Sequence, residues 1–70
     1  MFYVCLLQSE KDKGLYIGFT SDLRKHFNEH QEGQSKSTAY RRPWRLIYYE
    51  AYLNKSDALG RERFLKSGAG

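Results

Sequence analysis

Three stretches of this chain are rich in apolar, aromatic and β-branched residues and are separated by polar segments, a pattern typical of β-strands. In the second stretch, Tyr16 and Gly18 fall on one side, while Ile17 and Phe19 fall on the other. A glycine beside a tyrosine leaves a gap on that side of the sheet, where a ligand can approach the backbone. These stretches predict strands over Phe2–Gln8, Leu15–Phe19 and Arg45–Tyr52.

A helical pattern follows the second strand. Thr20 or Ser21 is predicted to cap this helix, with Asp22 favourable in its first turn. The helix is expected to run to about Gln31. The stretch from Gln34 to Pro43 is rich in Ser, Thr and Arg, and it predicts a loop.

A second helix follows the third strand, with Asn54 as its predicted cap and Lys55 to about Lys66 as its body. Seventy residues with no repeat or linker predict one domain over residues 1–70. The expected fold is of the α/β class, α+β type. It is a small three-stranded antiparallel sheet flanked by helices, in the order β-β-α-β-α.

Composition limits the class of protein. Apolar residues make up 40% of the chain and aromatic residues 16%, enough for one compact core. The single cysteine, Cys5, excludes an internal disulfide framework and fits a reducing compartment. No apolar run approaches the roughly 18 residues of a membrane span. We therefore expect a cytoplasmic protein without membrane association.

The aromatic residues are expected mainly in the core. Trp44, Tyr48 and Phe64 fit core positions better than base-stacking positions. Strict alternation in the third strand places Leu46, Tyr48 and Glu50 on one face of the sheet.

Positive charge gathers in and just after the predicted loop. The net charge is +4, and residues 34–44 include no acidic side chain. A patch of one sign with interleaved aromatic rings suits a polyanion, whereas a merely solvated loop is the simpler interpretation. The candidate nucleic-acid-binding residues are Lys36, Tyr40, Arg41, Arg42 and Arg45.

Two histidines lie on the first predicted helix. At 100° per residue, His26 and His30 flank the apolar stripe formed by Leu23 and Phe27. They therefore face the sheet and not open water. They are either hydrogen-bonded histidines at the edge of the core or members of a functional site.

The chain as a whole resembles the GIY-YIG nuclease family, and in particular its small stand-alone bacterial members. The resemblance covers roughly Phe2 to Ser67. The motifs that carry it, in order, are Leu15-Tyr16-Ile17-Gly18-Phe19-Thr20, Asp22-Leu23, Asn28-Glu29-His30, Pro43-Trp44-Arg45-Leu46-Ile47-Tyr48-Tyr49-Glu50, Asp57-Ala58, Arg61-Glu62 and Phe64-Leu65-Lys66.

The resemblance implies hydrolysis of phosphodiester bonds in DNA, in settings such as DNA repair. It implies that a tyrosine of the first motif acts as the base and that a tyrosine of the second motif orients the site. An arginine on the first helix would stabilise the charge of the phosphate, assisted by a histidine one turn later. A glutamate on a later helix would bind one divalent metal ion, usually Mg²⁺. Tyr16, His30 and Glu62 match these positions. Cys5 stands in place of the first tyrosine, and His26 in place of the arginine.

Several hypotheses remain open at this point. The first is an endonuclease dependent on Mg²⁺ or Mn²⁺, weakened because Cys5 and His26 replace the tyrosine and the arginine. The second is an inactive nucleic-acid-binding module that keeps the fold. A third is a Zn²⁺ site formed by Cys5, His26, His30 and Glu62. Spacing alone would favour a simple Glu62–Lys66 ion pair for the glutamate.

The expected partner is nucleic acid, with DNA as the substrate class. A domain this small offers little surface for reading a base sequence, so a protein partner that supplies specificity is compatible with it. The expected state is a monomer or a weak oligomer.

Overall fold

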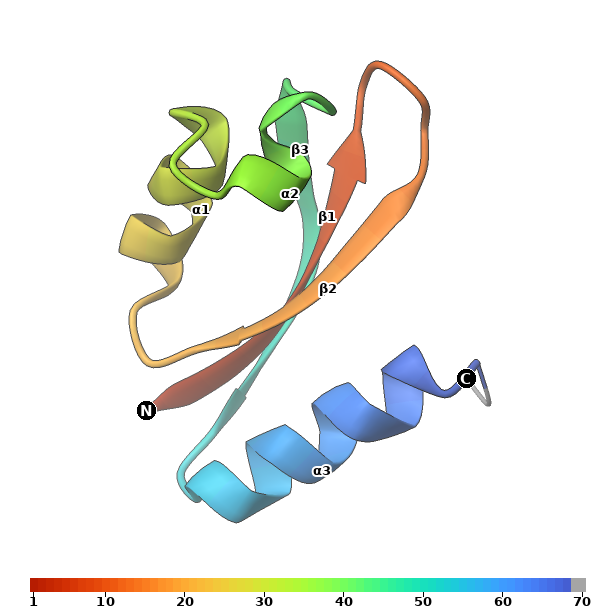
Figure 1. Cartoon of the computed structure of the whole chain (residues 1–70). Coiled ribbons are helices and arrows are strands. Elements are labelled where there is room, and N and C mark those ends of the chain that lie inside the picture. The colour runs from red at the N-terminus through yellow and green to blue at the C-terminus, as the bar shows by residue number, and fades with distance from the viewer. Residues whose placement is uncertain (69–70) are drawn as a thin grey trace.

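An antiparallel sheet of three strands forms the centre of the computed structural model, which describes residues 1–68 (Figure 1). The last two residues of the expected 1–70 domain lie outside the described residues. The strand order is β2-β1-β3, so β1 pairs with both neighbours. The strands are β1 (Phe2–Ser9), β2 (Leu15–Thr20) and β3 (Trp44–Tyr52).

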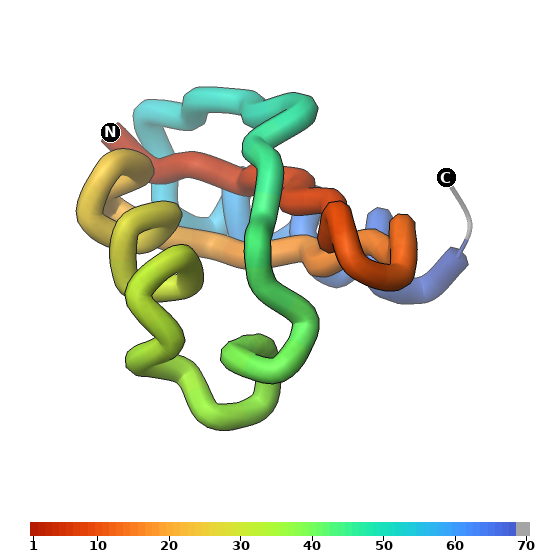
Figure 2. The backbone as a smooth tube through the Cα atoms, turned by 90° about the horizontal axis from the view of Figure 1, so that it is seen from above, coloured from red at the N-terminus to blue at the C-terminus, as the bar shows by residue number. Residues whose placement is uncertain are grey.

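The helices are α1 (Leu23–Gln31), α2 (Lys36–Ala39) and α3 (Lys55–Lys66). Figure 1 shows α1 and α2 on one side of the sheet and α3 on the other. Seen from above, β1 and β2 run side by side, and α3 lies behind them (Figure 2). The predicted α+β fold with its order of main elements is confirmed. Within residues 1–68, no helix has the length and apolar character required to cross a membrane.

The structure adds α2, a single helical turn inside the segment expected to be a loop. The backbone N–H groups of Thr38 and Ala39 donate to the carbonyl of Ser35, which closes this turn. The Thr38 side chain is buried, so tertiary packing orders a segment whose composition is that of a loop.

The start of α1 also differs from the expectation. Asp22, and not Thr20 or Ser21, is the N-cap, and its carboxylate accepts from the Lys25 N–H at 3.1 Å. The Thr20 hydroxyl instead accepts from the Asp22 N–H at 3.0 Å. An aspartate cap satisfies an orphan helix donor and places negative charge at the positive end of the helix dipole.

A β-bulge in β3 overturns the expected strict alternation. Leu46 pairs with Leu7, but Tyr48 pairs with Leu6, so the register shifts between them. Because Leu6 and Leu7 point to opposite faces, Leu46 and Tyr48 do too. The extra residue of a bulge cannot be seen in a pattern that assumes a period of two.

Of the three residues predicted for the core, the predictions for Tyr48 and Phe64 were wrong and that for Trp44 is confirmed. Tyr48 is 49% exposed and Phe64 is 45% exposed, whereas Trp44 is only 2% exposed. Phe64 lies under the Arg61 guanidinium, which is 5.4 Å from the ring centroid. The buried apolar residues are Val4, Cys5, Leu7, Trp44 and Ala58.

Glu50 fastens α3 to the face of the sheet opposite Cys5. Its carboxylate accepts from the Tyr48 hydroxyl at 2.7 Å, the Tyr52 hydroxyl at 2.8 Å and Arg61 Nε at 2.9 Å. The bonds from Tyr48, Arg61 and Tyr52 lower the pKa of Glu50 to about 2. His26 of α1 lies on the other face of the sheet, next to Gly18 and Cys5.

Candidate active site

Gly18 lies at the centre of the candidate site. A Cβ atom added there would lie 2.8 Å from His26 Nε2, 3.0 Å from Tyr16 Cε2 and 3.5 Å from Cys5 Sγ. Cys5 and Gly18 are direct partners across β1 and β2. Three predicted site residues thus meet at Gly18, because only glycine leaves this space.

The two histidines of α1 contact each other beside this centre. His30 Nε2 and His26 Nε2 are 3.2 Å apart, and His30 Nδ1 lies 2.8 Å from Thr38 Oγ1. The rings of Tyr16 and His30 have centroids 4.7 Å apart, and His30 also packs edge-on against Trp44 at 6.4 Å. The histidines are therefore joined both to the sheet and to α2.

A cavity of about 330 Å³ opens next to this cluster. Its lining carries one carboxylate but no lysine or arginine side chain. The residues that line it are Tyr16, His26, Glu29, His30, Gln34 and Ser35.

Burial holds the site in its neutral forms. It raises the pKa of the Cys5 thiol and of the Tyr16 phenol above their ordinary values. It lowers the pKa of His26 and of His30, and the neighbouring His26 lowers that of His30 further. At neutral pH the uncharged forms of the thiol, the phenol and both imidazoles therefore predominate.

These histidines predict a loss of stability in mild acid. Their folded pKa lies below the ordinary 6.5, so the unfolded chain binds more protons at pH values just under 6.5. We expect the free energy of unfolding to fall as the pH drops from 6.5 through the folded pKa. Urea denaturation at several pH values between about 7.5 and 5.5 measures this. A flat or rising profile would contradict it, and His26→Gln should flatten the slope.

Glu62 lies on α3 and does not line the cavity. Its Oε2 is 3.2 Å from Lys66 Nζ, so the i,i+4 ion pair expected from spacing is present. Its charge nevertheless contributes to raising the pKa of Cys5 and of Tyr16, which places it within electrostatic reach of the site. Residues 1–68 contain no cluster of three or more His, Cys, Asp or Glu side chains arranged to hold a metal ion together.

The candidate nucleic-acid-binding residues occupy different environments. Arg41 pairs with Asp12 at 2.9 Å and lies over the Trp44 ring, 4.8 Å from its centroid. Its charge therefore serves to hold the β1–β2 turn. Arg42 Nε donates to the Ala39 carbonyl at 2.7 Å. The exposed members of the set are Lys36, Tyr40, Arg42 and Arg45.

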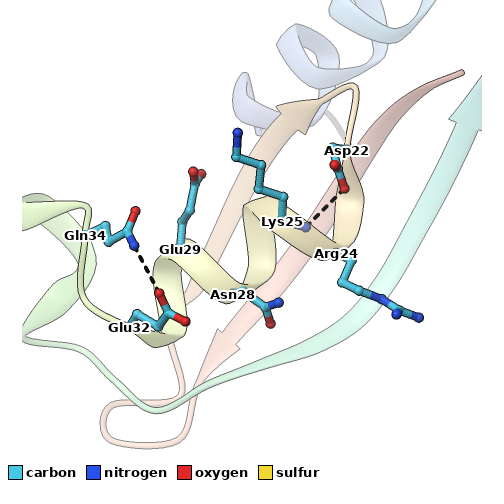
Figure 3. A pocket seen from close by; sticks show the side chains of 7 residues that line it. All are labelled: Asp22, Arg24, Lys25, Asn28, Glu29, Glu32 and Gln34. Carbon is cyan, nitrogen blue, oxygen red and sulfur yellow. Dashed lines mark hydrogen bonds between the residues drawn. The ribbon is translucent and has the colours of Figure 1, made fainter.

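A second hollow of about 400 Å³ lies on the solvent side of α1 and shares Glu29 and Gln34 with the cavity beside the histidines (Figure 3). Arg24 and Lys25 on its wall are offset by Asp22, Glu29 and Glu32. Because this hollow mixes both signs of charge and includes neither histidine, it is not part of the candidate site.

Sequence reasoning missed two residues that organise the site. Thr38 reaches His30 from α2, and Gln31 Oε1 accepts from the Trp44 backbone N–H at 2.6 Å. Both contacts join segments that are distant along the chain, and no local pattern marks them.

The fold and site define a small α+β domain with a histidine-lined cavity, and comparison with known proteins gives its family. The profile described as "GIY-YIG catalytic domain" matches residues 1–69. The chain therefore belongs to the GIY-YIG family of nuclease domains, whose substrates are in general nucleic acids.

Bacterial relatives agree with this family. The chain is 40% identical over 67 residues to a UPF0213 protein of Clostridium perfringens, covering 94% of the chain and 71% of the relative. It is 43% identical over 58 residues to one of Staphylococcus saprophyticus, covering 81% and 71%. It is 43% identical over 56 residues to one of Streptococcus pyogenes, covering 79% and 61%. No solved structure matches the chain significantly.

Proposed function

We propose that this chain is a metal-dependent endonuclease domain that hydrolyses phosphodiester bonds in DNA, with activity weakened by Cys5 and His26. The observation that carries the proposal is the convergence of Cys5, Tyr16, His26 and His30 around Gly18, beside an open cavity. Membership of the GIY-YIG family supplies the class of reaction.

Glu62 is the proposed ligand of one Mg²⁺ or Mn²⁺ ion. Mg²⁺ is commonly held by one or two carboxylates together with waters and substrate phosphates, so a single partly exposed carboxylate fits it. Binding requires the carboxylate to exchange its contact with Lys66 for the ion. The ion would stabilise negative charge on the phosphate.

The chain's own residues position the substrate. The Tyr16 phenol and His30 line the cavity and can hydrogen-bond the attacking water or a phosphate oxygen. His26, neutral at pH 7, replaces an arginine that would be permanently charged. Losing such a fixed donor typically costs about 100- to 1,000-fold in rate.

An inactive nucleic-acid-binding module remains the second candidate, and one observation favours it. The cavity lining contains Glu29 but no lysine or arginine, and Lys66, whose charge acts on the Tyr16 phenol, lies outside the lining. The exposed cations outside the cavity would still bind a polyanion in a salt-dependent manner.

A cleavage assay with branched, nicked and linear DNA tests the proposal. With Mg²⁺ or Mn²⁺ and enzyme in excess, we expect slow cleavage, and a loss of about 100-fold or more in Glu62→Ala, because a metal contributes several kcal/mol. Glu32→Ala removes an exposed carboxylate at the end of α1 and serves as the matched control.

The outcomes separate the two functions. Cleavage that persists in Glu62→Ala would overturn the role of Glu62. Intact DNA with salt-sensitive binding would support the binding module. Intact DNA with no binding at low salt would exclude both functions.

A further inference from the structure

We propose that Thr38 is a positioning residue. Its hydroxyl determines which ring nitrogen carries the proton in both site histidines. The hydroxyl donates to His30 Nδ1, His30 Nε2–H donates to His26 Nε2, and His26 keeps its proton on Nδ1. This inference rests on the proposed function for its catalytic meaning, but not for its structural content.

The direction of these hydrogen bonds follows from the acceptors that are available to the Thr38 hydroxyl. The Thr38 hydroxyl has two neighbours, the Ser35 carbonyl at 3.3 Å and His30 Nδ1 at 2.8 Å. The Ser35 carbonyl already accepts from the N–H groups of Thr38 at 3.1 Å and Ala39 at 2.9 Å. The hydroxyl has one proton and can donate it either to this carbonyl, at 3.3 Å, or to His30 Nδ1, at 2.8 Å. We assign the proton to His30, because that contact is shorter and the carbonyl already accepts two other bonds.

The next steps follow from the chemistry of neutral imidazole. A neutral ring carries one N–H and one lone pair, so a His30 that accepts at Nδ1 must donate at Nε2. Nε2 of His30 faces Nε2 of His26 at 3.2 Å, so His26 accepts there and carries its proton on Nδ1. The lowered pKa of both histidines keeps them neutral at pH 7 and above.

Thr38 is held firmly enough to impose this order. It is buried, and its backbone carbonyl accepts from Trp44 Nε1 at 3.1 Å and from the Arg41 N–H at 3.1 Å. Trp44 in turn packs against His30. The hydroxyl therefore has a fixed place relative to the histidine ring.

This series of hydrogen bonds gives His30 a defined chemical role in the proposed reaction. Its Nε2–H is an uncharged donor. A phosphate oxygen or a water can accept this hydrogen bond in place of His26 Nε2. Its lone pair is occupied by Thr38, so His30 is not available as a general base in this state.

Nitrogen-15 NMR of the histidine rings, at about pH 8 and without substrate, tests the inference directly. We expect a protonated Nε2 on His30 and a protonated Nδ1 on His26. In Thr38→Val the fixed order is lost, and His26 should exchange between tautomers. Thr38→Ser should keep the wild-type pattern, and Ser37→Ala on the exposed side of α2 is the control.

A proton on His30 Nδ1 or on His26 Nε2 in the wild type would overturn the inference, as would an unchanged pattern in a folded Thr38→Val. If Thr38→Val does not fold, the wild-type and Thr38→Ser spectra still decide. Cleavage provides a second measurement. Thr38→Val should lose about tenfold or more in rate, the size typical of removing a partner that orients a functional histidine, and Thr38→Ser should restore it. If the protein gives the expected spectrum but cleaves no DNA, the proposed function is contradicted and the assignment of the histidine protons stands.

Discussion

Replacing Trp44 with alanine is expected to lower the free energy of unfolding by about 3–5 kcal/mol, the usual cost of removing a large buried aromatic side chain. Trp44 begins β3, and its ring contacts His30 and Tyr16, at centroid distances of 6.4 and 6.0 Å. Its Nε1 donates to the Thr38 carbonyl at 3.1 Å. The change therefore opens a cavity where α1, α2 and the sheet meet.

Chemical denaturation followed by circular dichroism measures this loss. A domain of this size has a stability near the lower end of the usual 5–15 kcal/mol, so Trp44→Ala should leave a large unfolded fraction. Tyr40→Ala is the matched control, because Tyr40 lies in the same segment and is 68% exposed; its effect should stay within about 0.5 kcal/mol. Equal stability of the two variants would show that Trp44 does not organise the core.

The sequence was sufficient for the main strands and the two longer helices, because each has a strong local signal. Alternation marks β1 and β2, and the apolar stripe of Leu23 and Phe27 marks α1. The bulge in β3 and the turn of α2 have no such signal. Both depend on partners elsewhere in the fold: Leu6 and Leu7 for the bulge, and Thr38 packing for α2.

The candidate site was predictable to the same extent. Helical spacing placed His26 and His30 together towards the sheet, and the structure joins them at 3.2 Å. Arg41, in contrast, could not be placed from the sequence, because the local charge pattern assigns it to a basic patch. Its ion pair with Asp12 spans 29 positions and depends on the folded β1–β2 turn. Local patterns cannot show which charges fold back on one another.

The double substitution Cys5→Tyr with His26→Arg is expected to raise the rate of DNA cleavage by about 100-fold or more. The arginine would place a permanent, planar set of donors where His26 is neutral at pH 7. A fixed donor on the developing charge is worth about 100- to 1,000-fold in rate. Single-turnover cleavage with Mg²⁺ measures the gain, and Lys25→Arg adds a guanidinium to the exposed face of α1 as the matched control.

The two single substitutions should not add up to the double one. Cys5 is fully buried, and the space above Gly18 is already taken by His26 Nε2 and Cys5 Sγ. A tyrosine at position 5 alone therefore overpacks the site, at a cost of about 1–3 kcal/mol of stability. The longer and more flexible arginine can move its head group outward and free that space. Residues in contact are expected to show such coupling, which a double-mutant cycle measures.

The same cycle distinguishes a weakened nuclease from a binding module. A gain that appears only in the double variant, and disappears again with Glu62→Ala, would mean that the Gly18 site kept its metal position while losing its charge. A folded double variant that binds DNA but leaves it intact would mean that more than these two residues separates this chain from turnover. The convergence of Tyr16 and His30 would then serve recognition of the phosphate and not its hydrolysis.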